Sequence, residues 1–104
     1  MIIHTDTNGF DKVVLDKNRE LVLVDFFATW CGPCKMLSAN LEKLDKEAGD
    51  RIVIAKVDID ENPELAEKFG VESVPTMLIY RKGEKEMQVV GARTVDDLKR
   101  MLGL

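Results

Sequence analysis

The sequence predicts an α/β fold in which a mixed central sheet of four to five strands is flanked by four helices. Three observations lead to this prediction. Apolar runs typical of strands alternate with segments of helical periodicity along the whole chain. Residues 21–28 are almost entirely apolar, which is typical of a strand covered on both faces. Residues 81–84 read as a tight turn, so the two strands that they join must be antiparallel.

The first half of the chain alternates strand and helix. Residues 2–3 predict a short first strand, and Thr7 is expected to cap a helix that runs to about residue 17. The apolar run described above is the second strand. A helical apolar period then covers residues 34–48, and Gly49 is suited to end that helix.

A third strand and a third helix follow. Residues 52–59 predict the strand, which a right-handed crossover joins to the preceding one. Asn62 offers a capping side chain, and Pro63 suits the first turn of a helix. Gly70 is expected to end this helix.

The last part of the chain predicts a hairpin and a final helix. Residues 76–80 and 86–90 are the expected hairpin strands. Thr94, with Asp97 one turn later, resembles a capping box at the start of the last helix. With no linker and no repeat between these elements, residues 1–104 are expected to form one domain.

Composition and charge exclude several classes of protein. Hydrophobic residues make up 45% of the 104, which is enough for one apolar core. The net charge of −4 and the interspersed charges argue against a nucleic-acid surface. The N-terminal segment lacks the features of a signal peptide, and no apolar run is long enough to cross a membrane. We therefore expect a soluble, cytoplasmic protein that binds neither nucleic acid nor membrane.

The strongest chemical signal is the segment from Trp30 to Lys35, which reads Trp-Cys-Gly-Pro-Cys-Lys. It lies where the buried strand ends and a helix begins. Because a helix N-terminus carries a partial positive charge, it stabilises a thiolate, the species that attacks a disulfide. Cys31 is expected to be the exposed nucleophile, and Cys34 the more buried and less ionised thiol. The proline between them is expected to influence the redox potential.

A metal site is the main alternative for these cysteines. Structural zinc usually takes four ligands, and the chain has two Cys and one His. His4 is far from the cysteines in sequence, so a site within one chain would need carboxylates. A Cys-X-X-Cys motif beside a strand–helix–strand pattern favours a redox pair, and we expect no bound metal.

Asp25 is the one charge inside the apolar strand. Its pattern alone fits a strand-edge carboxylate that reaches water, but its closeness to Cys31 favours an acid/base for the Cys34 thiol. If it is buried, its pKa should rise. Lys56, in the neighbouring strand, is a candidate partner for Asp25, and an exposed strand lysine fits its pattern equally well.

The Val74-Pro75 pair begins a predicted strand. An ordinary turn explains such a proline. The rarer interpretation is a cis peptide bond that faces the cysteines and exposes main-chain groups to an extended substrate.

These residues resemble the thioredoxin family over nearly the whole chain. The Cys-Gly-Pro-Cys core is the most specific of the shared features. The others are Val24-Asp25-Phe26, Ala28, Trp30, Lys35-Met36, Val57-Asp58-Ile59-Asp60, Asn62-Pro63, Val74-Pro75-Thr76 and Gly91.

The resemblance implies general reduction of protein disulfides through a reversible Cys31–Cys34 disulfide. It implies that Cys31 is the nucleophile, Cys34 the resolving thiol, and Asp25 the acid/base with Lys56 as its partner. Disulfide-containing proteins would be substrates, and a thioredoxin reductase drawing on NADPH would recharge a monomer that holds no cofactor. The implied substrate-binding patch consists of Trp30, Gly32, Pro33, Val74, the cis-proline Pro75, and Gly91.

Three positions depart from the pattern of the family. Phe27 stands where many bacterial members have a second tryptophan, Ala39 where the long helix often has a proline, and Ser73 where a glycine is frequent. They concern the helix bend and the choice of partner rather than the dithiol chemistry. The rival functions are an oxidase or isomerase of the same fold, and a binding module without redox turnover.

Overall fold

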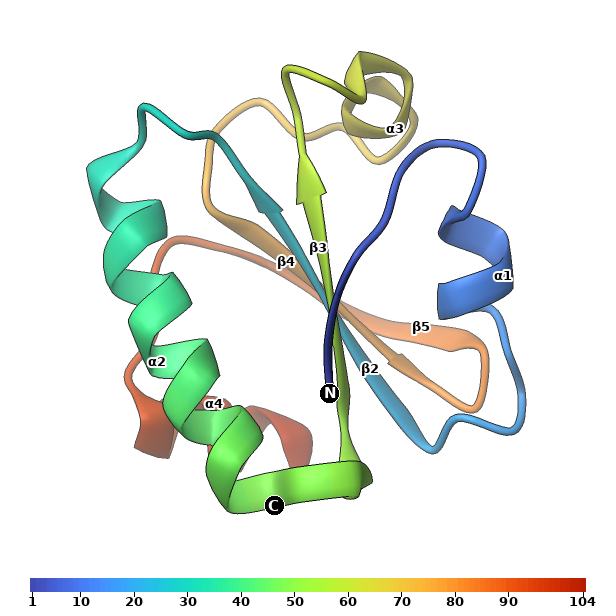
Figure 1. Ribbon diagram of the computed structural model, residues 1–104, viewed down its shortest axis with the longest axis vertical. Coiled ribbons are helices and arrows are strands. Elements are labelled where there is room, and N and C mark those ends of the chain that lie inside the picture. Colours follow the sequence, from blue (N-terminus) through green and yellow to red (C-terminus); the bar gives the residue numbers. More distant parts are fainter.

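The computed structural model describes residues 1–104 and confirms the predicted α/β fold. Five strands form one sheet in the order β1-β3-β2-β4-β5 (Figure 1). Strands β1, β3 and β2 are parallel, whereas β4 runs antiparallel to both β2 and β5. The strands are β1 (Ile2–His4), β2 (Leu21–Phe27), β3 (Val53–Asp58), β4 (Thr76–Arg81) and β5 (Glu84–Val90).

Four helices cover the two faces of the sheet. They are α1 (Phe10–Val14), α2 (Gly32–Ala48), α3 (Pro63–Lys68) and α4 (Val95–Leu102), with a short 3-10 turn at Gly49–Arg51. Figure 1 shows α2 and α4 together on one side of the sheet and α1 and α3 on the other. No helix combines the length and the apolar character that a membrane span requires.

The core consists of two apolar layers, one on each face of the sheet. Successive side chains of a strand point to opposite faces, so β2 contributes to both layers. Leu21 and Leu23 pack into the layer under α2 and α4, whereas Val22 and Val24 pack into the layer under α1 and α3. By this alternation Asp25 belongs to the α2 face, which is the face that carries the cysteines.

The predicted helix after β1 is shorter than expected, and its predicted cap is wrong. Helix α1 ends at Val14, and no side chain caps its start. Thr7 instead pairs with Asn62, whose Oδ1 accepts from the Thr7 amide at 2.9 Å and from its hydroxyl at 3.3 Å. Beyond the helix, the Asp16 carboxylate accepts from the Asn18 amide at 2.9 Å, a local turn that competes with further helix.

The starts of α2 and α3 also differ from the prediction. Helix α2 begins at Gly32, so Cys31 is its N-cap and lies directly before the first turn. Asn62 does occupy the N-cap of α3, but its side chain makes no capping bond. Its Oδ1, the atom that could accept from the helix, accepts from Thr7 instead, and its side-chain nitrogen donates to the Asp58 carbonyl at 3.0 Å.

The final hairpin and the last helix confirm the prediction. Lys82 and Gly83 both have positive φ, at 50° and 81°, as the two-residue hairpin turns that fit strand twist require. The Thr94 hydroxyl accepts from the Asp97 amide at 3.1 Å and so caps α4. Strand β5 begins at Glu84, slightly earlier than expected, because the turn is this tight.

Candidate active site

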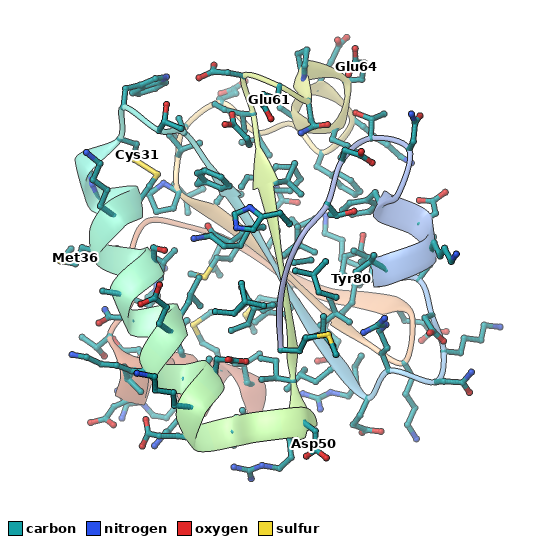
Figure 2. The ribbon with its side chains drawn as sticks, viewed as in Figure 1. Cys31, Met36, Asp50, Glu61, Glu64 and Tyr80 are labelled. Carbon is teal, nitrogen blue, oxygen red and sulfur yellow. A yellow bond between two sulfur atoms is a disulfide. The ribbon has the colours of Figure 1, made fainter.

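Cys31 and Cys34 form a disulfide at the junction of β2 and α2 (Figure 2). Their Cα atoms are 5.3 Å apart. The Cys34 amide, in the first turn of α2, donates to Cys31 Sγ at 3.1 Å. That first turn contains no acidic residue. The positive end of the helix and a directed N–H group therefore both act on Cys31 Sγ, and both favour negative charge there when the disulfide is reduced.

The prediction that Cys31 is exposed is wrong for this disulfide form. Cys31 is 5% exposed and Cys34 is 3% exposed, so burial scarcely distinguishes them. Phe27, Ile59 and Val74 pack around the pair. The difference between the two sulfurs lies instead in the amide that points at Cys31 Sγ.

Asp25 is completely buried on β2, so the water-reaching alternative is excluded. Neither of its carboxylate oxygens has a hydrogen-bond partner. Burial raises its pKa from 3.8 to about 6, against the opposing effect of the Lys56 charge. A buried carboxyl with this pKa exchanges its proton close to neutral pH.

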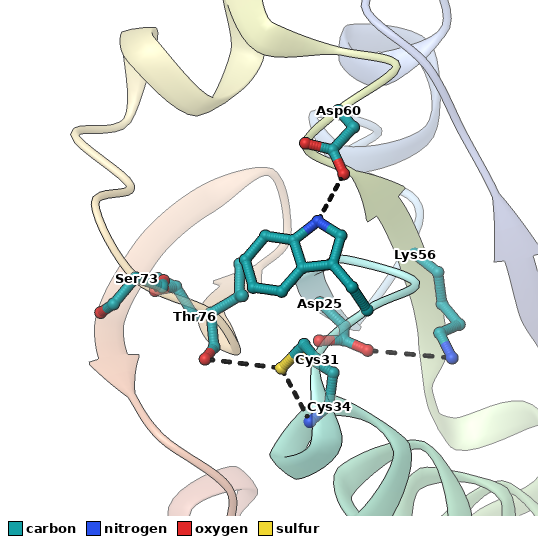
Figure 3. The surroundings of a disulfide bond; sticks show 9 residues. Asp25, Cys31, Cys34, Lys56, Asp60, Ser73 and Thr76 are labelled. Carbon is teal, nitrogen blue, oxygen red and sulfur yellow. Dashed lines mark hydrogen bonds and ion pairs between the residues drawn. A yellow bond between two sulfur atoms is a disulfide. The ribbon is translucent and has the colours of Figure 1, made fainter.

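Lys56 lies opposite Asp25 in the paired strands β2 and β3. Its ammonium is 3.9 Å from Asp25 Oδ2 and only 11% of its side chain is exposed, so the exposed-lysine alternative is wrong (Figure 3). The same ammonium donates to the hydroxyl of Ser38 on α2 at 2.6 Å. It also lies 5.1 Å from the centre of the Phe27 ring, a cation–π contact.

The Val74-Pro75 peptide bond is cis and lies beside the disulfide. The Val74 carbonyl oxygen is 3.7 Å from Cys31 Sγ. The Pro75 carbonyl accepts from the Gly91 amide at 2.8 Å, which joins the start of β4 to the end of β5. The structure therefore brings residues 74–75 to the dithiol and Gly91 to residue 75.

The surface next to the dithiol is partly apolar. Trp30 is 69% exposed, and its indole N–H donates to Asp60 Oδ2 at 2.9 Å (Figure 3). Gly32 and Pro33 are exposed in the first turn of α2. Val90, at the end of β5, is 57% exposed.

Two residues of this region make contacts that the sequence did not predict. Ser38 lies one helical turn after Cys34, which puts both on one face of α2, but a lone serine gives no signal of its contact with Lys56. Asp60 contacts Trp30 from the loop after β3, and only the fold brings them together. His4 is exposed on β1, and its ring packs edge-on against Phe27 rather than at the cysteines.

No group of three His, Cys, Asp or Glu side chains is arranged to hold a metal ion. A zinc site formed within this chain therefore has no ligand set, although two cysteines are present. The pairing of Cys31 with Cys34 agrees with the redox interpretation of the motif.

Comparisons with known proteins agree with the fold and the site. A family model described as Thioredoxin matches residues 1–103. The thioredoxin of Bacillus subtilis (strain 168) is 48% identical over 87 residues, which are 84% of each chain. The thioredoxin of Chlamydia caviae is 48% identical over 82 residues, 79% of each chain. The bifunctional thioredoxin reductase/thioredoxin of Mycobacterium leprae is 46% identical over 89 residues, 86% of this chain and 19% of that protein.

The matched region spans the sheet, the helices and the dithiol at the start of α2. With a Cys31–Cys34 disulfide at that position and a family model that covers residues 1–103, the chain belongs to the thioredoxin family of thiol–disulfide oxidoreductases.

Proposed function

We propose that the chain is a general reductant of protein disulfides in which Cys31 is the nucleophile and Cys34 the resolving thiol. The observation that carries this assignment is the hydrogen bond from the Cys34 amide to Cys31 Sγ, 3.1 Å long, at the start of α2. It stabilises a thiolate at Cys31 and leaves Cys34 without equivalent help. The two sulfurs therefore take different roles although they are equally buried.

The reaction has two exchanges. The Cys31 thiolate attacks one sulfur of a substrate disulfide; the substrate S–S bond breaks, a mixed disulfide forms, and a substrate thiolate leaves. Cys34, once deprotonated, attacks Cys31 Sγ and releases the second substrate thiolate. Two electrons pass from the dithiol to the substrate, and the Cys31–Cys34 disulfide that the structure contains is the product.

Asp25 is the proposed proton acceptor for Cys34, with Lys56 as its partner. Its pKa of about 6 supports this role, because a base works best when its pKa is near the working pH. Cys34 and Lys56 line one small pocket, and Lys56 is 3.9 Å from Asp25. The buried carboxylate thus lies beside a residue that lines the same pocket as Cys34.

The proposed substrate site is the surface around the disulfide. An exposed indole and a tight glycine–proline turn offer apolar contact, and main-chain groups beside the cis bond offer hydrogen bonds to an extended chain. The residues assigned to it are Trp30, Gly32, Pro33, Val74, Pro75 and Gly91.

A thioredoxin reductase is the proposed source of electrons. The fusion of a reductase with a thioredoxin in the Mycobacterium leprae relative supports this pairing. The chain itself is proposed to act as a monomeric domain, 1–104, that holds no cofactor. Because the dithiol must be regenerated after each turnover, the cytoplasm is the proposed compartment.

The roles of the cysteines are tested by trapping. Cys34→Ser should accumulate a mixed disulfide with a disulfide-containing peptide, detected by mass, because the second exchange cannot occur. Cys31→Ser, the matched control, should form no adduct. Adducts on Cys31→Ser and not on Cys34→Ser would reverse the assignment.

The direction of the reaction is tested by the reduction potential. Equilibration with dithiol buffers should give about −270 mV, the known value for a thioredoxin. A value near about −120 to −180 mV would instead make the chain an oxidase or isomerase.

A further inference from the structure

A pocket of about 230 Å³ opens between the end of β2 and helix α2, on the inner side of the disulfide. Cys34 and Ser38 line it from α2, and Lys56 lines it from β3. It is the place where the helix that carries the cysteines meets the strand that carries the buried ion pair. The contact between Ser38 and Lys56 lies inside this pocket.

The Lys56 ammonium has two oxygen neighbours at unequal distances. Ser38 Oγ accepts from it at 2.6 Å, a short hydrogen bond, whereas Asp25 Oδ2 lies at 3.9 Å, beyond hydrogen-bonding distance. Both oxygens of Asp25 remain without a hydrogen-bond partner, although this carboxyl is fully buried. The ammonium is thus hydrogen-bonded to a neutral hydroxyl, while the carboxylate of its ion pair has no hydrogen bond.

We propose that Ser38 is a positioning residue, whose hydroxyl accepts the hydrogen bond of the Lys56 ammonium and holds it back from direct contact with Asp25. A buried charge attracts its partner with an energy that depends on their separation and on the low local dielectric. Holding the two apart therefore limits how far Lys56 favours the ionised carboxylate. Where Asp25 acts as the base for Cys34, as proposed above, Ser38 sets the strength of that base.

The balance at Asp25 makes it sensitive to this distance. Burial raises its pKa and Lys56 lowers it, and the result is about 6. If the ammonium moved into direct contact, the lowering effect would grow while the burial stayed the same. The carboxylate would then be a weaker base and would take a proton from Cys34 less readily.

Other charged groups surround this pair. Lys35 lines the same pocket from α2, His4 lies in register with Lys56 on β1, and Asp58 follows Lys56 on β3. Strand β4 places the uncharged Met77 opposite Asp25. None of these is changed by a substitution at Ser38, so a variant there isolates the effect of its hydroxyl.

The test is the titration of the Asp25 carboxyl, followed by ¹³C NMR in the oxidised protein. Ser38→Ala should lower its midpoint by about 1 pH unit, because an opposite charge in close contact favours the ionised form. Ser38→Thr keeps a hydroxyl and should leave the midpoint at its parental value. An unchanged or raised midpoint in Ser38→Ala would overturn the proposal.

The variant Lys56→Met tests whether Ser38 changes the Asp25 midpoint through the Lys56 ammonium. In Lys56→Met, the further change Ser38→Ala should leave the Asp25 midpoint where it is. A fall of the same size in that background would also overturn the proposal, since no ammonium would be present to move.

This titration does not depend on the function proposed for Asp25. If Asp25→Asn resolves the mixed disulfide at the parental rate, the role of Asp25 as base is lost. A lowered midpoint in Ser38→Ala would still establish the positioning by Ser38. The two ideas therefore fail in different experiments.

Discussion

Helices α2 and α4 begin with the same contact, made by different atoms. At α2, Cys31 Sγ accepts from the Cys34 amide at 3.1 Å; at α4, Thr94 Oγ1 accepts from the Asp97 amide at 3.1 Å. Both capping residues have extended backbone conformations, as N-cap residues usually do. The backbone geometry of the two helix starts is thus alike.

The two helices differ in what surrounds the cap. Helix α4 has two carboxylates in its first turn, Asp96 and Asp97, whereas α2 has none. Thr94 is exposed to solvent, and Cys31 is buried against apolar neighbours. In α4 the positive end of the helix is compensated by nearby acids and the cap is structural. In α2 no acidic residue compensates the positive end of the helix, so it acts on Cys31 Sγ and favours a thiolate there.

The carboxylates that we associate with the two sites have pKa values shifted in opposite directions. Asp97 is partly exposed, and hydrogen bonds from Arg100 and Thr94 hold its pKa below the usual value. Asp25 is buried, and its pKa is raised to about 6. The start of α2 thus differs from that of α4 in two respects. Its first turn contains no acidic residue, and the carboxylate associated with it, Asp25, is buried and has a raised pKa.

The largest effect is expected from Cys31→Ser. A serine oxygen should cap α2 as the Thr94 oxygen caps α4, so the helix should form, but a hydroxyl is not ionised and cannot attack a disulfide. Reduction of a disulfide peptide should fall to the background of a Cys31→Ser, Cys34→Ser double variant, with an unchanged far-UV spectrum. Turnover clearly above that background would contradict the comparison.

The next effect is on stability, from Asp25→Asn. Because the folded pKa of Asp25 is raised from 3.8 to about 6, ionisation disfavours the folded state. The variant should be more stable than the parent by up to about 3 kcal/mol at pH 7 and above. The advantage should shrink as pH falls through about 6 and vanish below about 4. Urea unfolding of the oxidised proteins across this pH range measures it.

Asp97→Asn is the matched control for the direction of this change in stability. Since the folded pKa of Asp97 is lowered, its charge stabilises the folded state, and the variant should be less stable than the parent near neutral pH. A gain of stability in Asp97→Asn, or a loss in Asp25→Asn at pH 7, would show that the two carboxylates do not differ as described.

A smaller effect on stability is expected from Thr94→Ala. Loss of the capping oxygen of α4 should cost about 1 kcal/mol of unfolding free energy, and Thr94→Ser should restore most of it. Neither variant should change the rate of disulfide reduction, because this cap shares no contact with the dithiol. A rate that falls in parallel with stability would mean that the two helix starts are coupled.

The smallest effect is expected from Gly32→Asp, which gives α2 the acidic first turn that α4 has. A Cβ at Gly32 meets nothing within 4 Å, so the side chain fits. The added charge should raise the pKa of the Cys31 thiol and slow its attack at pH 7 by about two- to fivefold. The pH dependence of alkylation of the reduced protein measures this. Gly32→Asn is the isosteric control, and identical profiles for both variants would exclude the charge effect.

Features that depend on neighbours in sequence were predictable. The Thr94 cap, the Lys82–Gly83 turn and the buried strand β2 each follow from local residue chemistry and periodicity. The Cys-Gly-Pro-Cys motif predicted the dithiol for the same reason. Such features need no knowledge of which distant segments meet.

Features that depend on distant partners were predicted incompletely. Thr7 has the residue type of a helix cap, but its hydroxyl bonds to Asn62, far along the chain, and that single contact removes a cap from both α1 and α3. The pattern of its strand alone fitted an Asp25 carboxylate that reaches water, whereas the residue is completely buried. The contact of Ser38 with Lys56 required the packing of α2 on β3. Cys31 looked exposed because its sequence does not show that Val74 covers it.

The separation of the core into two layers has a consequence for how this chain tolerates change. The layer under α1 and α3 holds the aromatic cluster of Phe10, Phe69 and Tyr80, whereas the dithiol lies on the side of α2. Substitutions without shared partners act almost additively. Substitutions at Phe10, Phe69 and Tyr80 are therefore expected to change heat resistance while leaving the redox chemistry unchanged. Ile59, which packs against both the aromatic layer and the dithiol, is the position where the two properties are expected to change together.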